Sequence, residues 1–494
     1  MADQKSPEAD IGMIFEGSYP YVSGGVSAWA QQLIESLPEF TFTVIAILPD
    51  RKPRKLKYKL PKNIVNLHHI FIFEEEKHYK TFGRSGWRKT IEEFHLQSGQ
   101  SNSQFFTHVA ELFGGSAPPK LEDLINSKGS FEMVSRLYSK NAPDASFLDY
   151  FWTWRFMHLG MFRIMKAPLF NCRLYHSIST GYSGMYGSRS RIFHKRPYFL
   201  TEHGIYTMER KIEIARSDWI YDKKKEEIRP ERTLGIFKNM WIRAFRTMSR
   251  ITYEFADEII TLYPRNQTWQ IKDGAQKNKL RVIYNGIDFD HYHAYSKERL
   301  PSRFNIVLIG RVVAIKDIKT FIRCVKILSN HIPELKAFII GPTEEEPKYY
   351  QECLQLVNLF GIKDIIEFTG KVDVVEYYHR MDVLLLTSIS EAQPLVILEA
   401  NAAGIPVVCS NVGDCRELLY GRPGPDREIG QSGFVFSMAN PEQAANQVTT
   451  LHKDLKLYKR FSQAGIKRTG MFYKKEYQID SYRKLYNSYL QEKT

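Results

Sequence analysis

Residues 304–330 read FNIVLIGRVVAIKDIKTFIRCVKILSN, and this stretch decides the fold class. Its first part is a continuous apolar run that ends at Gly310, which predicts a strand buried on both faces. The part after it places apolar residues at Phe321, Val325 and Leu328, near the spacing of an amphipathic helix. A buried strand followed at once by a helix is the repeating unit of a parallel α/β sheet.

The sequence on either side repeats this alternation. Further strands are predicted for the apolar runs AFIIG (337–341), VLLLTS (383–388) and IPVVCS (405–410), with helical segments between them. The first half of the chain begins in the same way, with IGMIFEG (11–17) and FTVIAILPD (42–50). The sequence therefore predicts an α/β protein of two Rossmann-like, doubly wound domains.

The predicted domains differ in regularity. We expect residues 1–285 to form the first domain, with a polar, aromatic and helical insertion at about 74–170, and residues 286–465 to form the second. RVIYNGID (281–288) is interpreted as the strand that closes the first half. Ligands of such domains bind at the carboxyl ends of the strands, and two such domains are expected to face each other across a central cleft.

The composition excludes several classes of protein. Hydrophobic residues make up 43% and charged residues 25%, which excludes disorder and collagen for the chain as a whole. No apolar run approaches the roughly 18 residues of a membrane helix, and the polar start MADQKSPEAD is unlike a signal peptide. The five cysteines are too scattered for a disulfide framework or a zinc site, so we expect a reduced, cytoplasmic protein.

The net charge of +14 suggests a nucleic acid or an anionic membrane as partner. The charge is uneven: residues 1–285 carry +12, residues 286–450 carry −5 and residues 451–494 carry +7. The densest basic run is RKPRKLKYKLPK (51–62), and no nucleic-acid-binding motif accompanies it. We expect no nucleic-acid partner and interpret the charge as a face suited to an anionic membrane or an acidic partner. A merely solvated loop is the alternative.

Two carboxylates follow the predicted strand at 383–388. Glu391 lies in the loop, Pro394 suits the first turn of the next helix, and Glu399 lies one to two turns inside it. The N–H groups at the start of that helix can bind an anion, and the carboxylates can accept hydrogen bonds from ribose and sugar hydroxyls. The alternative is a loop glutamate and a surface-helix glutamate without a ligand.

Two cations follow the predicted strand at 304–310. Arg311 comes directly after it, and Lys316 lies five residues further on, at the start of the next helix. An arginine fork and a lysine charge at a strand-to-helix turn suit a diphosphate. Two solvated cations are the alternative.

The first half offers weaker candidates. Gly24 and Gly25, in the SGG of YVSGGVSAW (21–29), would let a phosphate or sugar approach the backbone, or would form a plain turn. His203, in TEHG (201–204), could hydrogen-bond a sugar hydroxyl, although a lone histidine is more often structural. Asp288-Phe289-Asp290 has the spacing of a metal-binding pair, but an interdomain turn is the favoured interpretation.

In this order the motifs resemble those of a GT-B glycosyltransferase of the retaining family 4. The SGG loop, NGID (285–288), the GR…K pair and the two glutamates with seven residues between them lie at the expected points. The resemblance covers nearly the whole sequence. Longer stretches, such as EGSYPYVSGGVSAW, TEHGIYTMERKIEI and LTSISEAQPLVILEA, are similar to the soluble glycosyltransferases of Pel exopolysaccharide synthesis.

The resemblance implies a role for each candidate. Arg311 and Lys316 would neutralise the donor diphosphate as the sugar leaves, and Glu399 would hold the ribose hydroxyls. Glu391 would contact the transferred sugar, and His203 would lie near it. Three further stretches would complete the donor site: Gly24 and Gly25 beside the diphosphate, Lys371 and Val372 beside the base, and Leu395 at the start of the helix.

The resemblance also implies a function. It is the retaining transfer of a sugar, from a UDP-linked hexose or N-acetylhexosamine, to a growing exopolysaccharide of the Pel-type biofilm matrix, with no metal or other cofactor required. The expected partners are the UDP-sugar donor, the polysaccharide acceptor and an inner-membrane export complex that the protein contacts peripherally. The helical segment 466–494 would cross back to the first domain.

Two other functions fit the same motifs. In a GT-B sugar-nucleotide epimerase, the twin carboxylates would act as acid and base. In a non-catalytic nucleotide-sugar-binding scaffold, the fold would be kept without turnover. One departure from the family also bears on the donor site: the common pattern E-G-F-G-L is Glu391-Ala392-Gln393-Pro394-Leu395 here. Pro394 has no backbone N–H to donate, so one sugar or phosphate contact must be absent or replaced.

Overall fold

The computed structural model describes residues 7–73, 87–96, 103–115, 118–216, 235–296 and 303–491. The chain divides into two compact units, the first made of residues 1–282 with 483–494 and the second of residues 283–482. Parts of the predicted insertion (74–86, 97–102 and 116–117) and the last three residues lie outside the described residues. Both units are built on a parallel sheet, so the predicted α/β class with two Rossmann-like domains is confirmed.

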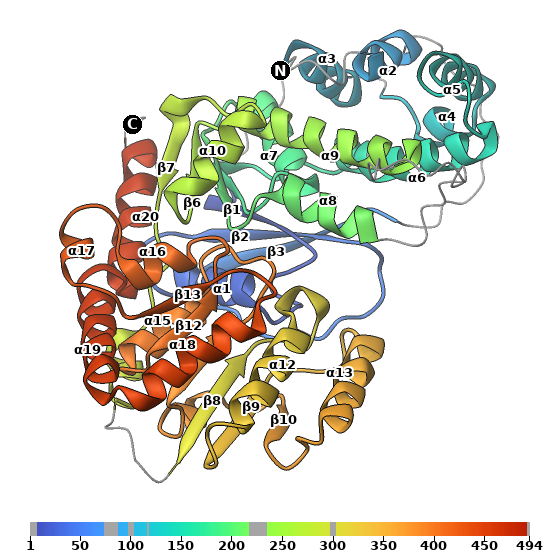
Figure 1. Ribbon diagram of the computed structural model, residues 1–494. Helices are drawn as coiled ribbons and strands as arrows, with labels where there is room; N and C mark the ends of the chain where they lie inside the picture. The colour runs from blue at the N-terminus through green and yellow to red at the C-terminus, as the bar shows by residue number, and fades with distance from the viewer. Residues whose placement is uncertain are drawn as a thin grey trace. The chain divides into compact units, whose positions relative to one another are not determined.

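The first unit has a seven-stranded sheet in the order β3-β2-β1-β4-β5-β6-β7, parallel throughout (Figure 1). The order reverses between β1 and β4, which makes the carboxyl ends of these strands the topological switch point. The central strands are buried along nearly their whole length, as continuous apolar runs predict. The strands are β1 (Ala9–Glu16), β2 (Phe42–Leu48), β3 (Ile64–Phe71), β4 (Cys172–Ser177), β5 (Tyr198–Glu202), β6 (Glu258–Thr261) and β7 (Leu280–Val282).

Helices cover this sheet and form the insertion. In Figure 1 the insertion helices α2 to α6 gather at one end of the unit, where α3 and α6 contact α9. Aromatic and methionine side chains of α6 and α9 join the core of the sheet, so the insertion shares one hydrophobic core with it. The helices are α1 (Gly25–Glu35), α2 (Trp87–Leu96), α3 (Ser103–Gly114), α4 (Leu121–Asn126), α5 (Lys128–Asn141), α6 (Phe147–Lys166), α7 (Tyr182–His194), α8 (Tyr206–Arg216), α9 (Ile236–Phe255) and α10 (Pro264–Lys272).

The second unit has a six-stranded parallel sheet in the order β10-β9-β8-β11-β12-β13, with the switch point between β8 and β11. Its strands are β8 (Phe304–Ile309), β9 (Leu335–Ile340), β10 (Ile366–Gly370), β11 (Val383–Leu386), β12 (Val407–Ser410) and β13 (Gly433–Phe436). Its helices are α11 (Phe289–His293), η2 (Ala314–Lys316), α12 (Ile318–Ser329), α13 (Pro347–Phe360), α14 (Val375–Tyr378), α15 (Leu395–Ala402), α16 (Cys415–Tyr420), α17 (Pro425–Glu428), α18 (Pro441–Lys453), α19 (Leu455–Phe472) and α20 (Lys475–Leu490).

Two segments differ from the sequence-based expectation. The strand expected over 281–288 is only the three-residue β7, because the NGID residues leave the sheet and Asp288 caps α11 through the backbone N–H of His291. The last helix, α20, begins in the second unit, and its residues from Arg483 onward belong to the first. No helix among the described residues is long and apolar enough to cross a membrane.

Candidate active site

The switch point of the second unit brings together two of the predicted site residues. Lys316 follows β8 at the end of η2, and Glu391 follows β11, so 75 positions of sequence separate them. Their side chains form an ion pair in which only 19% of Lys316 and 12% of Glu391 is exposed. Ser388 donates a second hydrogen bond to the same carboxylate oxygen, at 2.7 Å. A cation and a carboxylate therefore meet where ligands of this fold bind.

Local hydrogen bonds fix the two loops that carry this pair. The hydroxyl of Thr387, just after β11, donates to the carbonyls of Lys316 and Asp317 at 3.1 and 3.0 Å. Asp317 adopts a left-handed backbone conformation (φ 46°), and its side chain accepts the N–H of Thr320 to cap α12. The turn after β8 is therefore held against the end of β11, which positions Lys316 beside Glu391.

Arg311 lies on the same strand end but has a different partner. Its guanidinium donates to both carboxylate oxygens of Glu345, at 2.5 and 2.6 Å. Glu345 belongs to the loop after β9, and half of each side chain is exposed. An exposed pair of this kind contributes little to stability, so Arg311 can exchange Glu345 for an anionic ligand at small cost.

Glu399, the second predicted carboxylate, sits one turn inside α15 in a separate cluster. The hydroxyl of Tyr378 donates to it at 2.8 Å, and Tyr292 hydrogen-bonds it as well. Burial raises the pKa of Glu399, while the hydrogen bonds from the two tyrosines and the nearby His291 oppose that shift. Among the described residues no ion pair joins Glu399 to Lys316 or Arg311.

The loop before α15 depends on a residue that the sequence analysis did not single out. Gln393 is buried, accepts the backbone N–H of Asn285 at 2.6 Å and donates to the Asp414 carboxylate at 2.7 Å. Gln478 of α20 accepts the N–H of Gly286 and donates to the Asn285 side chain. The signal was available in the EAQPL departure, because a polar residue replaces the phenylalanine of the common pattern.

This loop also fixes where Pro394 lies and why a glycine faces it. Pro394 is the N-cap of α15, one position earlier than expected, with extended backbone angles. Gly413 has φ +51°, and a Cβ there would lie 2.2 Å from the carbonyl oxygen of Glu391. Only glycine combines this conformation with so close an approach, so Gly413 lets the segment before α16 press against the Glu391 loop.

The remaining predicted donor residues of this unit lie near the same sheet edge. Lys371 and Val372 follow β10, Lys371 exposed and Val372 partly buried against the core. Leu395 is the first residue of α15 and is half-buried. Among the described residues, none of these three side chains forms a hydrogen bond or an ion pair.

In the first unit, the switch point carries the SGG loop. Gly24 is the N-cap of α1, and both Gly24 and Gly25 are exposed; a Cβ at either would meet no atom within 4 Å. His203 follows β5, and its ring packs edge-on against Trp29 of α1, with the ring centroids 4.6 Å apart. Burial lowers the pKa of His203 to about 4, so its imidazole is neutral near pH 7.

Two acidic residues near these candidates, Glu202 and Asp288, are held by hydrogen bonds or ion pairs within their own units. Glu202 accepts hydrogen bonds from Tyr253, Gln270 and the N–H of Tyr206, and burial raises its pKa to about 7. Asp288 caps α11 and pairs with Lys475, so it serves a turn within the second unit. No cluster of three or more metal-ligating side chains occurs in the part of the chain that the structure describes.

Comparison with known families separates the two halves of the chain. Residues 9–278 match the family described as domain of unknown function (DUF3492), which is more than half of the chain. Residues 303–454 match the family described as glycosyl transferases group 1. The second match spans the turn after β8 and the loop after β11, with Lys316 and Glu391.

Curated proteins are similar to part of the chain. The chain is 27% identical over 237 residues to the D-inositol 3-phosphate glycosyltransferase of Streptomyces avermitilis, covering 45% of this chain and 47% of that protein. It is 24% identical over 243 residues to the N-acetyl-alpha-D-glucosaminyl L-malate synthase of Bacillus anthracis, covering 48% and 61%. The chain thus spans about half the length of the curated relatives it matches.

Two solved structures match the fold over nearly the whole chain. Anabaena HepE in complex with UDP has a TM-score of 0.60 at 14% identity, covering 97% of this chain and 100% of that one. Sucrose-phosphate synthase from Thermosynechococcus elongatus also has a TM-score of 0.60, at 15% identity, covering 97% and 98%. The chain has the GT-B fold; it belongs to the family of the domain of unknown function DUF3492, joined here to a segment that matches glycosyl transferases group 1.

Proposed function

We propose that this protein is a retaining glycosyltransferase that takes a sugar from a UDP-linked donor. The observation that carries the proposal is the Lys316–Glu391 pair at the switch point between β8 and β11. A mostly buried cation beside a carboxylate offers both halves of a nucleotide-sugar site, a positive charge for the diphosphate and an acceptor for sugar hydroxyls. Arg311 adds a second cation on the same strand end.

The proposed chemistry follows from these charges. The bond between the anomeric carbon and the diphosphate oxygen breaks, and UDP leaves. The acceptor hydroxyl oxygen bonds to the same face of that carbon, and its proton passes to the departing diphosphate. Lys316 and Arg311 stabilise the negative charge that develops on the leaving group, which is the largest electrostatic demand of the step. Because two side-chain cations fill this role, the proposal requires no metal.

The residues around the pair complete the proposed donor site. Glu399 would accept hydrogen bonds from the ribose, since Tyr378 and Tyr292 hold its carboxylate in place. Lys371, Val372 and Leu395 would flank the nucleotide. The first unit would supply Gly24 and Gly25 to the diphosphate and a neutral His203 to a sugar hydroxyl.

The identity of the donor and acceptor rests on resemblance. HepE was solved with UDP and with UDP-glucose, which supports a UDP-linked hexose or N-acetylhexosamine as the donor. The sequence stretches shared with the glycosyltransferases of Pel exopolysaccharide synthesis support a growing biofilm polysaccharide as the acceptor. We further propose that the protein works in the cytoplasm, in peripheral contact with an inner-membrane export complex.

A panel of donors tests this function. The protein is incubated with UDP-glucose, UDP-galactose and their N-acetyl forms, with and without oligosaccharide acceptors, and UDP release is measured beside the mass and anomeric configuration of the product. Transfer with retained configuration, unchanged by EDTA, is the expected result. An altered sugar without UDP release would replace the proposal with an epimerase, and binding of a nucleotide sugar without turnover would replace it with a non-catalytic scaffold.

A further inference from the structure

A pocket of about 560 Å³ lies in the first unit, among the helices α2, α5, α6 and α9. This volume is within the range of small-molecule sites in proteins. Its lining mixes polar and apolar side chains, and the apolar ones include Phe94, Trp154, Met157, Met161 and Met240. Three methionines in one lining are notable because their flexible, polarisable side chains adapt to irregular apolar ligands.

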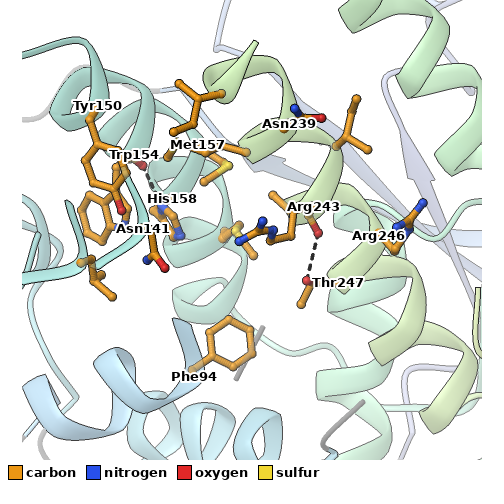
Figure 2. Close-up of a pocket in the computed structure, with 16 residues that line it drawn as sticks. Phe94, Asn141, Tyr150, Trp154, Met157, His158, Asn239, Arg243, Arg246 and Thr247 are labelled. Carbon is orange, nitrogen blue, oxygen red and sulfur yellow. Dashed lines mark hydrogen bonds between the residues drawn. The ribbon is translucent and has the colours of Figure 1, made fainter. Parts of the chain in front are cut away.

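The pocket carries positive charge and no described negative charge. Arg243 and Arg246 of α9 are among its lining residues, and none of the lining residues is acidic. Figure 2 shows Arg243 reaching from α9 toward α6, whereas Arg246 lies further along the helix. Arg246 faces the Asp273 carboxylate at 3.6 Å, but no ion pair of Arg243 occurs among the described residues. Arg243 is therefore the cation available to a ligand.

The helix that forms one wall of the pocket is also apolar on its outer side. Leu148 and Trp152 of α6 are one turn apart and are 62% and 56% exposed, and Phe131 of α5 is 50% exposed. Large exposed aromatic and aliphatic side chains beside one another are typical of surfaces that contact lipid or a protein partner. Here they lie on α5 and α6, two of the helices that also line the pocket with its methionines and arginine, and this combination favours lipid.

We propose that this pocket binds a single-chain anionic amphiphile, with the chain against the methionines and the phosphate or carboxylate head on Arg243. The pairing follows from chemistry: the apolar side chains of the lining favour a hydrocarbon chain over a fully hydrophilic ligand, and the Arg243 guanidinium favours an anionic head over a neutral one. The site uses none of the residues assigned to the donor. It would bring an anionic lipid to the DUF3492 domain of the chain.

Calorimetric titration of the full-length protein tests the site. The probes are dodecyl phosphate and dodecanoate below their micellar concentrations, with dodecyl maltoside, inorganic phosphate and a maltooligosaccharide as comparisons. We expect one site for at least one anionic amphiphile, and binding at least about tenfold weaker for each comparison probe, as expected when a charge-assisted hydrogen bond or the apolar contact is lost. The head that binds tighter identifies phosphate or carboxylate as the preferred group.

Matched variants locate the ligand. Arg243→Met, which keeps an apolar stem, should weaken binding of the anionic amphiphile about tenfold or more. Arg246→Met should change it less than about twofold, because Arg246 has an acidic neighbour. Met157→Trp should fill the pocket and abolish binding. UDP-sugar turnover and the melting temperature of Arg243→Met should stay at wild-type values.

Four results would overturn the proposal. These are equal effects of Arg243→Met and Arg246→Met, equally tight binding of dodecyl maltoside, tighter binding of the oligosaccharide, and full binding by a folded Met157→Trp protein. Should Met157→Trp fail to fold, the comparison of the two arginine variants decides the matter alone.

Discussion

At the scale of single residues, the central feature is the contact between Lys316 and Glu391. The sequence identifies both residues, because each follows an apolar strand, but it gives no reason to pair them across 75 positions. The strand order pairs them: β8 and β11 are neighbours at the switch point, so the loops after them meet. In the proposed function, the donor diphosphate would compete with Glu391 for Lys316, and the released Glu391 carboxylate would then accept hydrogen bonds from the sugar hydroxyls.

Alanine variants of Lys316 and Arg311 should both lose activity, but they should differ in how much stability they lose. We expect Lys316→Ala and Arg311→Ala each to lower transfer about 100-fold or more, as loss of a charge-stabilising group does. Lys316→Ala leaves a mostly buried carboxylate unpaired and should cost about 1–3 kcal/mol of unfolding free energy, whereas the exposed Arg311 pair should cost less than about 1 kcal/mol.

The tryptophans allow these effects to be assigned to a unit. All seven tryptophans precede residue 283, so tryptophan fluorescence follows unfolding of the first unit alone, and far-UV circular dichroism follows both. Urea unfolding of Lys316→Ala should therefore shift the circular-dichroism transition and leave the fluorescence transition in place. A shift confined to fluorescence would contradict the assignment.

Glu202 should make the stability of the first unit depend on pH. Burial raises its pKa to about 7 from an ordinary value of 4.5, so the folded state holds a proton that the unfolded state has released. This contribution is fully present below about pH 4.5 and is lost as the pH rises through 7. Relative to Glu202→Gln, the wild type should lose about 3 kcal/mol over this window, measured by urea unfolding with tryptophan fluorescence. A constant difference between the two proteins would refute the shifted pKa.

At the scale of elements, the sequence predicts the buried strands well and the exposed ones poorly. β8 and β11 are continuous apolar runs, and both lie where the sequence analysis placed them. β3 was missed because IVNLHHIF mixes polar and apolar residues at the half-exposed edge of its sheet. The shape of the loop before α15 could not be predicted either. It depends on the hydrogen bonds that join Gln393 to Asn285 and to Asp414, which are 108 and 21 positions away in the sequence.

Gln393 connects the loop before α15 to the segments of Asn285 and Asp414, and loss of its hydrogen bonds should loosen all three. Gln393→Met keeps the size of the side chain but leaves the Asn285 N–H and the buried Asp414 carboxylate without their partner. We expect a loss of about 2–4 kcal/mol from the second unit and a raised KM for the donor. Gln431→Met makes the same exchange at an exposed position and should change neither quantity. Equal donor KM values in wild type and Gln393→Met would argue against a positioning role for Gln393.

At the scale of the whole molecule, charge is the feature most open to test. Residues 51–62 lie between β2 and β3, and their lysines are exposed, while Arg54 pairs with Asp50 at 2.8 Å. Lys52 also lies 4.0 Å from the Asp50 carboxylate, so Lys55, Lys57, Lys59 and Lys62 are the exposed lysines of this stretch that can meet an anionic surface. We predict salt-sensitive binding to phosphatidylglycerol vesicles, which should weaken about tenfold or more when Lys55, Lys57, Lys59 and Lys62 become glutamine.

The matched control makes the same exchange at exposed lysines of the second unit, namely Lys348, Lys363, Lys453 and Lys456. Co-sedimentation with vesicles at low and high salt compares the two variants. The control should bind like the wild type. Equal binding by both variants, or binding that salt does not weaken, would leave residues 51–62 as a solvated loop.

The most direct test of the account is a donor-turnover comparison of wild type and Lys316→Ala on the same panel of UDP-sugars. The account predicts that the wild type transfers one of these sugars to an acceptor with release of UDP. It also predicts that a folded Lys316→Ala protein loses this transfer about 100-fold or more. Wild-type turnover in a folded Lys316→Ala protein would contradict a donor site at the β8–β11 switch point.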